Sequence, residues 1–388
     1  MKFTCDKLAI SDAVGTVQKA VAARSTLSVL EGIMIKARDN KIILTGNDLE
    51  IGIECVIEAN VESEGSIVVN SKLFGEIIRK LSGEQVVIEV NSNNVTKIKC
   101  GNSKFDINGI SAEEFPEIPK FDADFNITLS QKQLKDIVRH TIFAVGTSES
   151  KLILTGCLLE AYGNHINMVA VDGFRLALKK ITTENETVSG YLGDVSLVIP
   201  SKTLNELTKI IEDSDGEIKI LCSQKNVRFE FENVVFTSRL LEGDYIDYKK
   251  IIPQEFKTTV KASVRSLVDA VERASLIITS DVAKSPVVMK ISNGEIFINC
   301  ETSAGKVEEF IPIEMTGDDI EIGFNNRYML EALRGATGDE VYLNFVGAVN
   351  PCLITPVEGD SFKFIVLPVR LKNDNWYTHR IYKAWPTA

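Results

Sequence analysis

The sequence predicts an α+β protein of three repeated units, each made of two similar halves that pair one helix with an antiparallel sheet. Two recurring segments predict it: a strand–turn–strand segment occurs three times, and a helix followed by an alternating strand comes after each copy. A further helix opens each unit, so the six helices start at a mean interval of about 64 residues. With 388 residues, 44% hydrophobic and 25% charged, the chain is long enough for a sizeable core and is not disordered, collagen-like or a coiled coil.

The first recurring element is a predicted hairpin at residues 31–54, 155–178 and 285–308. Each copy has an apolar strand, a polar turn and a second strand of alternating polarity. The turn residues accept positive φ at low cost, which is the chemistry of tight hairpins. They are Asp39 with Asn40, Gly163 with Asn164, and Asn293 with Gly294.

The second recurring element is a predicted helix at residues 71–81, 201–211 and 326–336. Apolar residues follow one another at helical spacing, and we expect Ser71, Ser201 and Asn326 to be the N-caps. The helix that opens each unit is expected at residues 6–21, 130–144 and 263–277. Six helix-plus-sheet halves could form an arc with helices on one side and sheets on the other, and two arcs could close a ring.

Cysteine and histidine patterns exclude several kinds of site. The seven cysteines are scattered and never spaced as C-x-x-C, so we expect reduced, buried thiols. Three histidines without metal-ligand spacing, and no Walker A or G-x-G-x-x-G loop, predict neither a metal nor a cofactor. No signal peptide or run of 18 apolar residues is present, so we expect a cytoplasmic protein without membrane contact.

Charge is distributed unevenly along the chain. The net charge is −11, which by itself disfavours a nucleic-acid partner. The six expected helices together carry +6, however, which leaves −17 for the rest of the chain. This pattern indicates either solvated helix faces or a basic inner surface that meets a polyanion inside an acidic shell. No aromatic platform accompanies the basic residues, so a duplex is favoured over a single strand.

Seven motifs in order and spacing resemble the bacterial DNA sliding clamp family, the beta subunit of DNA polymerase III. They are MKFTC from residue 1, ARSTLSVL from 23, LTGNDLEIGIE from 44, VDGFRLAL from 171, VFTSRLLEGDYIDYKKIIP from 235, EIGFNNRYMLEAL from 321 and IVLPVRL from 365. The resemblance covers residues 1–371, nearly the whole chain.

The resemblance implies three clamp domains at residues 1–122, 123–253 and 254–371, followed by an aromatic tail at 372–388. It also implies a head-to-tail homodimer, a ring with helices lining the hole, which encircles duplex DNA and has no catalytic activity. The implied partners are the DNA polymerase III catalytic subunit, an ATP-driven clamp loader and other proteins with a clamp-binding motif.

The resemblance further implies an apolar pocket for a short linear peptide. Phe174 stands where many members have histidine and Ile246 where many have proline, so we expect a changed pocket shape and motif preference. Without the resemblance, several of the apolar residues are predicted to be strand core. The implied pocket residues are Leu154, Val171, Gly173, Phe174, Arg175, Leu176, Ile246, Lys250, Ile251, Ile365, Leu367, Pro368, Val369 and Arg370.

DNA contacts and a dimer seam are the remaining expected sites. By matching loops and an inner helix, the resemblance implies DNA contacts at Arg24, Lys151 and Lys202, and helix charge adds Lys72, Arg79 and Lys80. For the dimer, a strand with Phe105 and Ile107 is expected to meet a helix end with Leu276 and Ile277. Ordinary core is the alternative interpretation of these four.

The tail KNDNWYTHRIYKAWPTA extends 17 residues beyond the usual family ending. It holds both tryptophans of the chain, Trp376 and Trp385. It is either a native extension or an added segment. One hypothesis is that it folds over the pocket or docks into a neighbour's pocket.

Two other functions remain open from sequence. One is a carboxylate-dependent hydrolase that uses Asp48 or Asp172, although Thr302 takes their place in the third unit. The other is a purely structural scaffold without nucleic acid.

Overall fold

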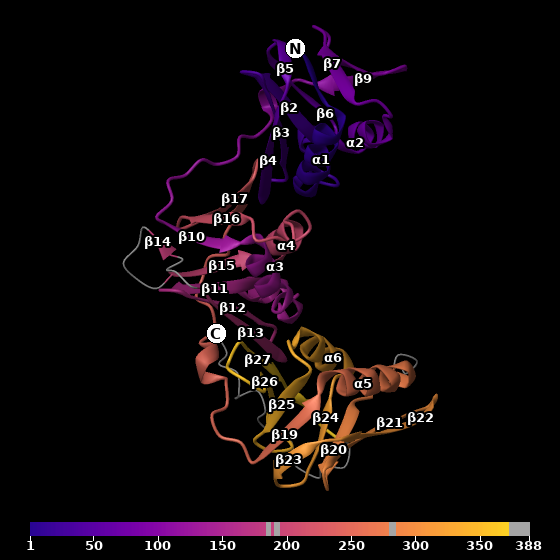
Figure 1. The fold of residues 1–388 in the computed structure, drawn as a ribbon, viewed down its shortest axis with the longest axis vertical. Helices are drawn as coiled ribbons and strands as arrows, with labels where there is room; N and C mark the ends of the chain where they lie inside the picture. The colour runs from indigo at the N-terminus through magenta and orange to yellow at the C-terminus, as the bar shows by residue number, and fades with distance from the viewer. Residues whose placement is uncertain (184–187, 190–194, 279–284, 372–388) are drawn as a thin grey trace. The chain divides into compact units, whose positions relative to one another are not determined.

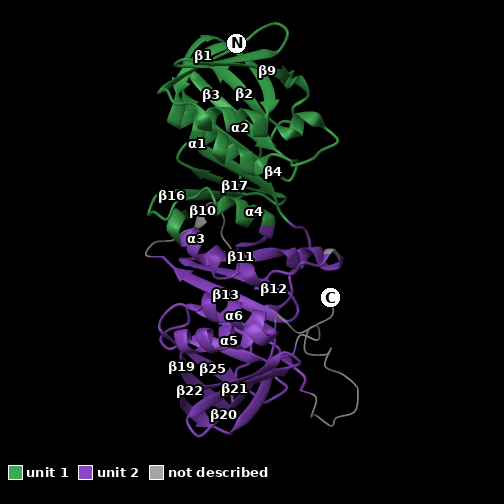
Figure 2. Ribbon diagram, turned by 90° about the vertical axis from the view of Figure 1, so that its right-hand side faces the viewer, with its two compact units in different colours: residues 1–132, 187–192, 202–240 green, residues 133–186, 193–201, 241–388 purple. Residues whose placement is uncertain are grey.

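A computed structural model describes residues 1–183, 188–189, 195–278 and 285–371 (Figure 1). The predicted aromatic tail at 372–388 lies outside the described residues. The chain divides into two compact units, which Figure 2 shows in green and purple. Unit 1 holds residues 1–132, 187–192 and 202–240, and unit 2 holds 133–186, 193–201 and 241–388.

Among the described residues, one sheet of 14 strands runs through unit 1 in the order β14-β10-β16-β17-β18-β4-β3-β2-β6-β9-β8-β7-β1-β5. All its pairings are antiparallel, and the β18–β4 pairing joins residues 234–238 to residues 51–55. The strands are β1 (Lys2–Asp6), β2 (Gly32–Arg38), β3 (Lys41–Asn47), β4 (Ile51–Glu58), β5 (Asn60–Ser63), β6 (Gly65–Asn70), β7 (Gln85–Val90), β8 (Val95–Cys100), β9 (Ser103–Ile110), β10 (Phe125–Ser130), β14 (Val188–Ser189), β16 (Glu217–Cys222), β17 (Asn226–Phe231) and β18 (Val234–Arg239).

Unit 2 has two sheets in its described part, ordered β15-β11-β12-β13-β27-β26-β25-β19-β23 and β22-β21-β20-β24-β28. In the first, β13 pairs with β27, which brings residues 175–179 beside residues 362–366. The strands are β11 (Gly156–Tyr162), β12 (His165–Val171), β13 (Arg175–Thr182), β15 (Val195–Pro200), β19 (Thr258–Ser263), β20 (Val287–Ser292), β21 (Glu295–Thr302), β22 (Gly305–Pro312), β23 (Glu314–Gly317), β24 (Ile320–Phe324), β25 (Glu340–Phe345), β26 (Cys352–Pro356), β27 (Phe362–Val366) and β28 (Pro368–Val369).

All six predicted helices are present. They are α1 (Lys7–Val17), α2 (Ser71–Lys80), α3 (Gln131–Arg139), α4 (Ser201–Leu207), α5 (Val264–Ile278) and α6 (Asn326–Gly335). Several are shorter than predicted because the chain continues as a tighter turn, as after α1 at Gln18–Ala20. In Figure 1, α1 and α2 lie together within unit 1 and α5 and α6 within unit 2, each pair in contact.

The predicted N-caps of two helices are wrong by one residue. Asn70, not Ser71, caps α2 by accepting a hydrogen bond from the Leu73 amide at 2.9 Å. Asn325, not Asn326, caps α6. The shift has a physical cause, because an amide oxygen in the extended residue before the helix reaches the free N–H groups of the first turn.

The three predicted hairpins are confirmed as β2–β3, β11–β12 and β20–β21. Their turns use positive φ as expected, for example at Asp39 (49°), Asn40 (56°) and Gly163 (57°). All seven cysteines are buried and free, as predicted. None of the helices in the described part of the chain has the length and hydrophobicity that a membrane span requires.

Candidate functional site

A tight turn between β12 and β13 is the centre of the candidate site. Asp172 Oδ1 accepts hydrogen bonds from the amides of Phe174 and Arg175, at 2.8 and 3.0 Å. Gly173 has φ = 92°, a conformation that a side chain would strain. The turn therefore holds Phe174 outward, and its side chain is 58% exposed.

Arg175 ties this turn to α6. Its side chain is only 5% exposed; Nε donates to Asp172 Oδ2 at 2.9 Å, and Nη1 donates to Glu331. The guanidinium also lies over the ring of Tyr328, 4.4 Å from its centroid. A buried charge is tolerated when it is paired and fully hydrogen-bonded. Arg175 therefore fixes the position of the turn against the helix.

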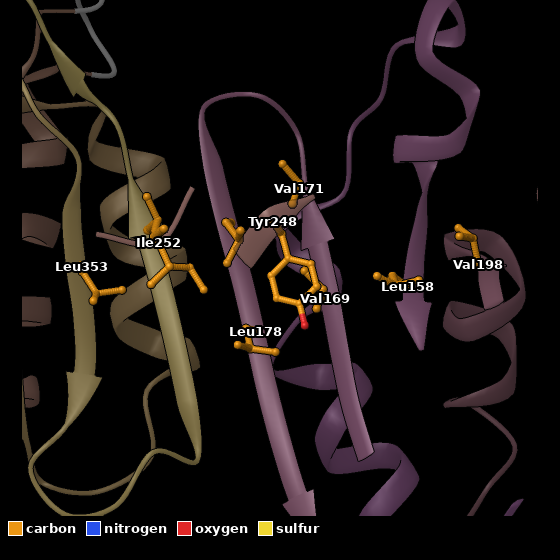
Figure 3. Close-up of a cluster of buried hydrophobic side chains, with 10 residues drawn as sticks. Leu158, Val169, Val171, Leu178, Val198, Tyr248, Ile252 and Leu353 are labelled. Carbon is orange, nitrogen blue, oxygen red and sulfur yellow. The ribbon is translucent and has the colours of Figure 1, made fainter. Parts of the chain in front are cut away.

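An apolar cluster lies beside the turn (Figure 3). Figure 3 shows the ring of Tyr248 with Val169, Val171 and Leu178 around it. The buried members are Leu158, Val169, Val171, Leu176, Leu178, Val198, Tyr248, Ile252, Leu353 and Ile365, and partly buried Ile153, Leu241, Tyr245, Ile246, Ile251 and Phe256 pack against them. The partly buried members form an apolar surface that a ligand side chain can reach.

Tyr248 anchors the segment that carries two of the predicted pocket residues, Lys250 and Ile251. Its hydroxyl donates to Glu160 Oε2 at 2.5 Å. Burial, and then the Glu160 carboxylate, raise the pKa of Tyr248, so the hydroxyl stays protonated as the donor. Lys250 points into solvent, 81% exposed, and pairs with Asp247 at 2.8 Å.

A cleft of about 190 Å³ also opens beside the turn. The Phe174 ring stacks on Tyr328, with centroids 6.1 Å apart, and the side chains of Lys151 and Arg327 contribute positive charge. The cleft can therefore accept apolar and acidic groups together. It is lined by Val145, Gly146, Thr147, Ser148, Lys151, Leu154, Asp172, Phe174, Arg175, Arg327 and Tyr328.

The last described strands complete the site. Ile365 of β27 pairs with Leu176 of β13, and the Leu367 amide donates to the Phe174 carbonyl at 2.9 Å. Pro368 and Val369 form β28, which pairs with β24. Arg370 is exposed just beyond β28.

The structure places all fourteen predicted pocket residues in unit 2. The turn, the cluster and the β27–β28 segment bring most of them together, while Lys250 and Arg370 are exposed at its margins. Sequence reasoning missed Tyr328, Glu331, Tyr248 and Glu160. Tyr328, Glu331 and Tyr248 lie inside motifs that pointed to the family, and that was the one signal that could have found them, whereas Glu160 lies in none of these motifs.

The predicted DNA-contacting residues differ in their surroundings. Arg24, Lys72 and Lys80 are exposed in unit 1, and Lys151 is exposed at the cleft. The exposed Arg79 donates to Gln18 Oε1 at 3.0 Å.

Lys202 has partners that the sequence did not reveal. Its ammonium lies 2.7 Å from Asp48 and 2.7 Å from Glu50. This double pairing reduces the charge that Lys202 presents to a phosphate.

Two of the predicted seam residues have large exposed side chains. Phe105 on β9 is 40% exposed and Leu276 on α5 is 74% exposed, whereas Ile107 is buried at 8% and Ile277 is half-buried. Strand β9 pairs with β8 along residues 103–108 but with β6 only at Gly109 and Ile110. Strand β22 is the last strand of its sheet in the described part of the chain.

Comparison with known proteins identifies the family. The N-terminal, central and C-terminal domains of the DNA polymerase III beta subunit match residues 1–119, 128–247 and 249–370. The Bacillus subtilis beta sliding clamp is 35% identical over 383 residues, covering 95% of this chain and 100% of that protein.

Solved structures agree with this match. A DNA polymerase III beta subunit from Eubacterium rectale has a TM-score of 0.91 at 36% identity, covering 96% of this chain and 100% of its own. A Pseudomonas aeruginosa sliding clamp bound to griselimycin has a TM-score of 0.89 at 25% identity, covering 96% and 100%. The chain therefore belongs to the DNA polymerase III beta subunit family, the beta sliding clamps.

Proposed function

We propose that two copies of this chain close a ring around duplex DNA and tether the replicative polymerase through the site on unit 2. Sliding clamps are processivity factors without catalytic activity, and as a member of that family the chain acts in replication. A closed ring cannot leave the duplex sideways, so topology, rather than strong contact with DNA, holds it in place. The tethered polymerase then remains at a high effective concentration.

The observation that carries the tethering role is the accessible apolar surface beside the rigid turn. Ile246 and Ile251 are half-buried against the apolar cluster, and Phe174 is exposed at the turn. Pre-positioned apolar side chains with a few charges at the margin suit a short linear peptide. We propose as its ligands the DNA polymerase III catalytic subunit, the clamp loader and other proteins with a clamp-binding motif, which meet the ring in the cytoplasm.

The open strand edges support the ring. Among the described residues, no strand pairs with residues 103–108 of β9 on the side away from β8, or with the outer edge of β22, a liability that a second copy can cover. Pairing of these edges would bring Phe105 and Ile107 of one copy to Leu276 and Ile277 of the other. The same contact repeated by twofold symmetry closes two chains into a ring.

For DNA we propose contacts from Arg24, Lys72, Arg79, Lys80 and Lys151, each of which is exposed. Such contacts to phosphates are independent of sequence and weaken with salt, so an encircled duplex can slide. Lys202 is the weakest member of the predicted set because two carboxylates already pair with it.

The combined change of Leu367→Ala and Arg370→Ala should weaken binding of a clamp-binding peptide by about tenfold or more, since an apolar contact and a marginal charge are both lost. The measurement is fluorescence anisotropy with a labelled peptide that carries the motif. The dimer, followed by native mass spectrometry, should persist. Lys290→Ala is the matched control, because Lys290 is an exposed, ion-paired lysine on β20 of unit 2 that is not among the pocket residues. Full peptide affinity in the double variant would refute the assignment of the pocket.

A further inference from the structure

The turn at the pocket has a close copy in unit 1. Asp48 Oδ1 accepts hydrogen bonds from the amides two and three residues later, at 3.0 and 2.7 Å. Asp172 makes the same two bonds at 2.8 and 3.0 Å. The residue after each aspartate has positive φ, 75° at Leu49 and 92° at Gly173. The internal repeat has therefore preserved the turn itself, and not only the hairpin around it.

The neighbouring strand is also placed in the same way. The Arg239 amide donates to the Glu50 carbonyl at 3.2 Å, as the Leu367 amide donates to the Phe174 carbonyl at 2.9 Å. Strand β18 therefore stands to β4 as β27 stands to β13. The backbone frame of the proposed peptide pocket thus occurs a second time, within unit 1.

The copy differs at the position that corresponds to Leu176. Leu176 pairs with Ile365, and at the matching place Gly52 pairs with Thr237. A Cβ on Gly52 would lie 2.7 Å from both Cγ1 and Cδ1 of Ile118. Because Gly52 has no side chain, it leaves a space, and the side chain of Ile118 occupies that space.

Other contacts hold the segment around Ile118 in this position. Asn47, which is 5% exposed, donates from Nδ2 to the Pro116 carbonyl at 3.1 Å. Phe115 is 7% exposed and packs into an apolar cluster with Val29, Leu30 and Val68. The space left beside Ile118 and Pro119 is only about 20 Å³. The segment therefore occupies the copy of the backbone frame in unit 1 in the way that a bound ligand would occupy the pocket in unit 2.

We propose that the surface around Gly52, where β18 pairs with β4 in unit 1, is a second peptide-binding site. It is occupied by the chain's own residues 115–121. Its ligand class is an extended peptide that presents a branched aliphatic side chain between an acidic residue and a proline, as Glu117, Ile118 and Pro119 do. The likeness to the pocket of unit 2 rests on the proposed function. Binding of residues 115–121 at Gly52 does not, since it rests on the contacts of unit 1 alone.

The test is a titration of a labelled synthetic peptide, FPEIPKF, into the full-length chain. Ile118→Gly should bind it at least about tenfold more tightly than the unchanged chain, because the internal segment no longer competes effectively. Ile118→Val keeps a branched side chain in the seat and should behave like the unchanged chain. A peptide with asparagine in place of the isoleucine should not bind Ile118→Gly.

A double variant locates the binding. Adding Gly52→Ala to Ile118→Gly places a methyl group in the seat of Ile118 and should abolish binding of the peptide. Equal affinity for the unchanged and Ile118→Gly chains, absence of binding to Ile118→Gly, or full binding to the double variant would each overturn the proposal. The same chains are also titrated with a clamp-binding peptide, whose affinity should not change. If the clamp-binding peptide does not bind any of these chains, that result would count against the pocket on unit 2. It would not affect the proposal of a site at Gly52.

Discussion

Replacing Leu276 with aspartate is expected to convert the two-chain ring into single chains. Leu276 is 74% exposed in the single chain, so its side chain is available to be buried against Phe105 and Ile107 of a second copy. Burying a leucine contributes about 1.5–3 kcal/mol, and an unpaired carboxylate in that place costs several kcal/mol more. Since each 1.4 kcal/mol is tenfold in affinity, dimerisation should weaken by roughly a hundredfold or more.

Analytical ultracentrifugation measures this effect directly. One chain has a mass of 42.9 kDa. The unchanged protein should sediment with twice that mass, and Leu276→Asp with the mass of one chain. Leu8→Asp is the matched control, because Leu8 is a 66% exposed leucine on α1, which has no part in the proposed seam. A Leu276→Asp protein that remains dimeric would place the seam elsewhere.

Replacing Arg175 with alanine should cost both stability and peptide binding. Arg175 is 5% exposed and pairs with Asp172 and Glu331, so its removal leaves Asp172 without its cation and Glu331 with only the exposed Arg327. Breaking a buried ion pair costs about 3–5 kcal/mol, and the lower end is expected here because Glu331 is 31% exposed. The turn that positions Phe174 also loses its tie to α6, so affinity for a clamp-binding peptide should fall about tenfold or more.

Urea unfolding and peptide titration together test this prediction. For the unfolding measurement Arg327→Ala is the matched control, because Arg327 also pairs with Glu331 but is 67% exposed, where an ion pair contributes at most about 1 kcal/mol. Arg175→Lys should rescue only part of the loss, since one ammonium cannot reproduce the two separate donors, Nε and Nη1, that reach Asp172 and Glu331. Equal free energies of unfolding for Arg175→Ala and Arg327→Ala would show that the buried network does not hold the turn.

Local patterns were enough to predict most of the fold. Alternation of apolar residues predicted the hairpins, and residues such as Asn40 and Gly163 that tolerate positive φ located their turns. Helical spacing located all six helices. Their ends were less accurate, because Asn70 and Asn325 compete for the capping position with the residues that follow them.

Contacts between distant residues could not be predicted in the same way. Arg175 and Glu331 are 156 residues apart, and Tyr248 and Glu160 are 88 apart. Neither sequence separation corresponds to a helical or strand periodicity, so no local pattern indicates either contact. The pairing of Lys202 with Asp48 and Glu50 was hidden for the same reason, although it changes what a basic residue on an expected inner helix can do.

Retention on DNA of different topology tests the central claim, a closed ring around the duplex, most directly. The protein is assembled on a nicked circular duplex with a clamp loader and ATP, separated from free protein, and followed before and after the circle is cut once. It should stay on the intact circle and leave the linear product by sliding off its ends, while Leu276→Asp should be retained on neither. Equal retention on circular and linear DNA would contradict the ring.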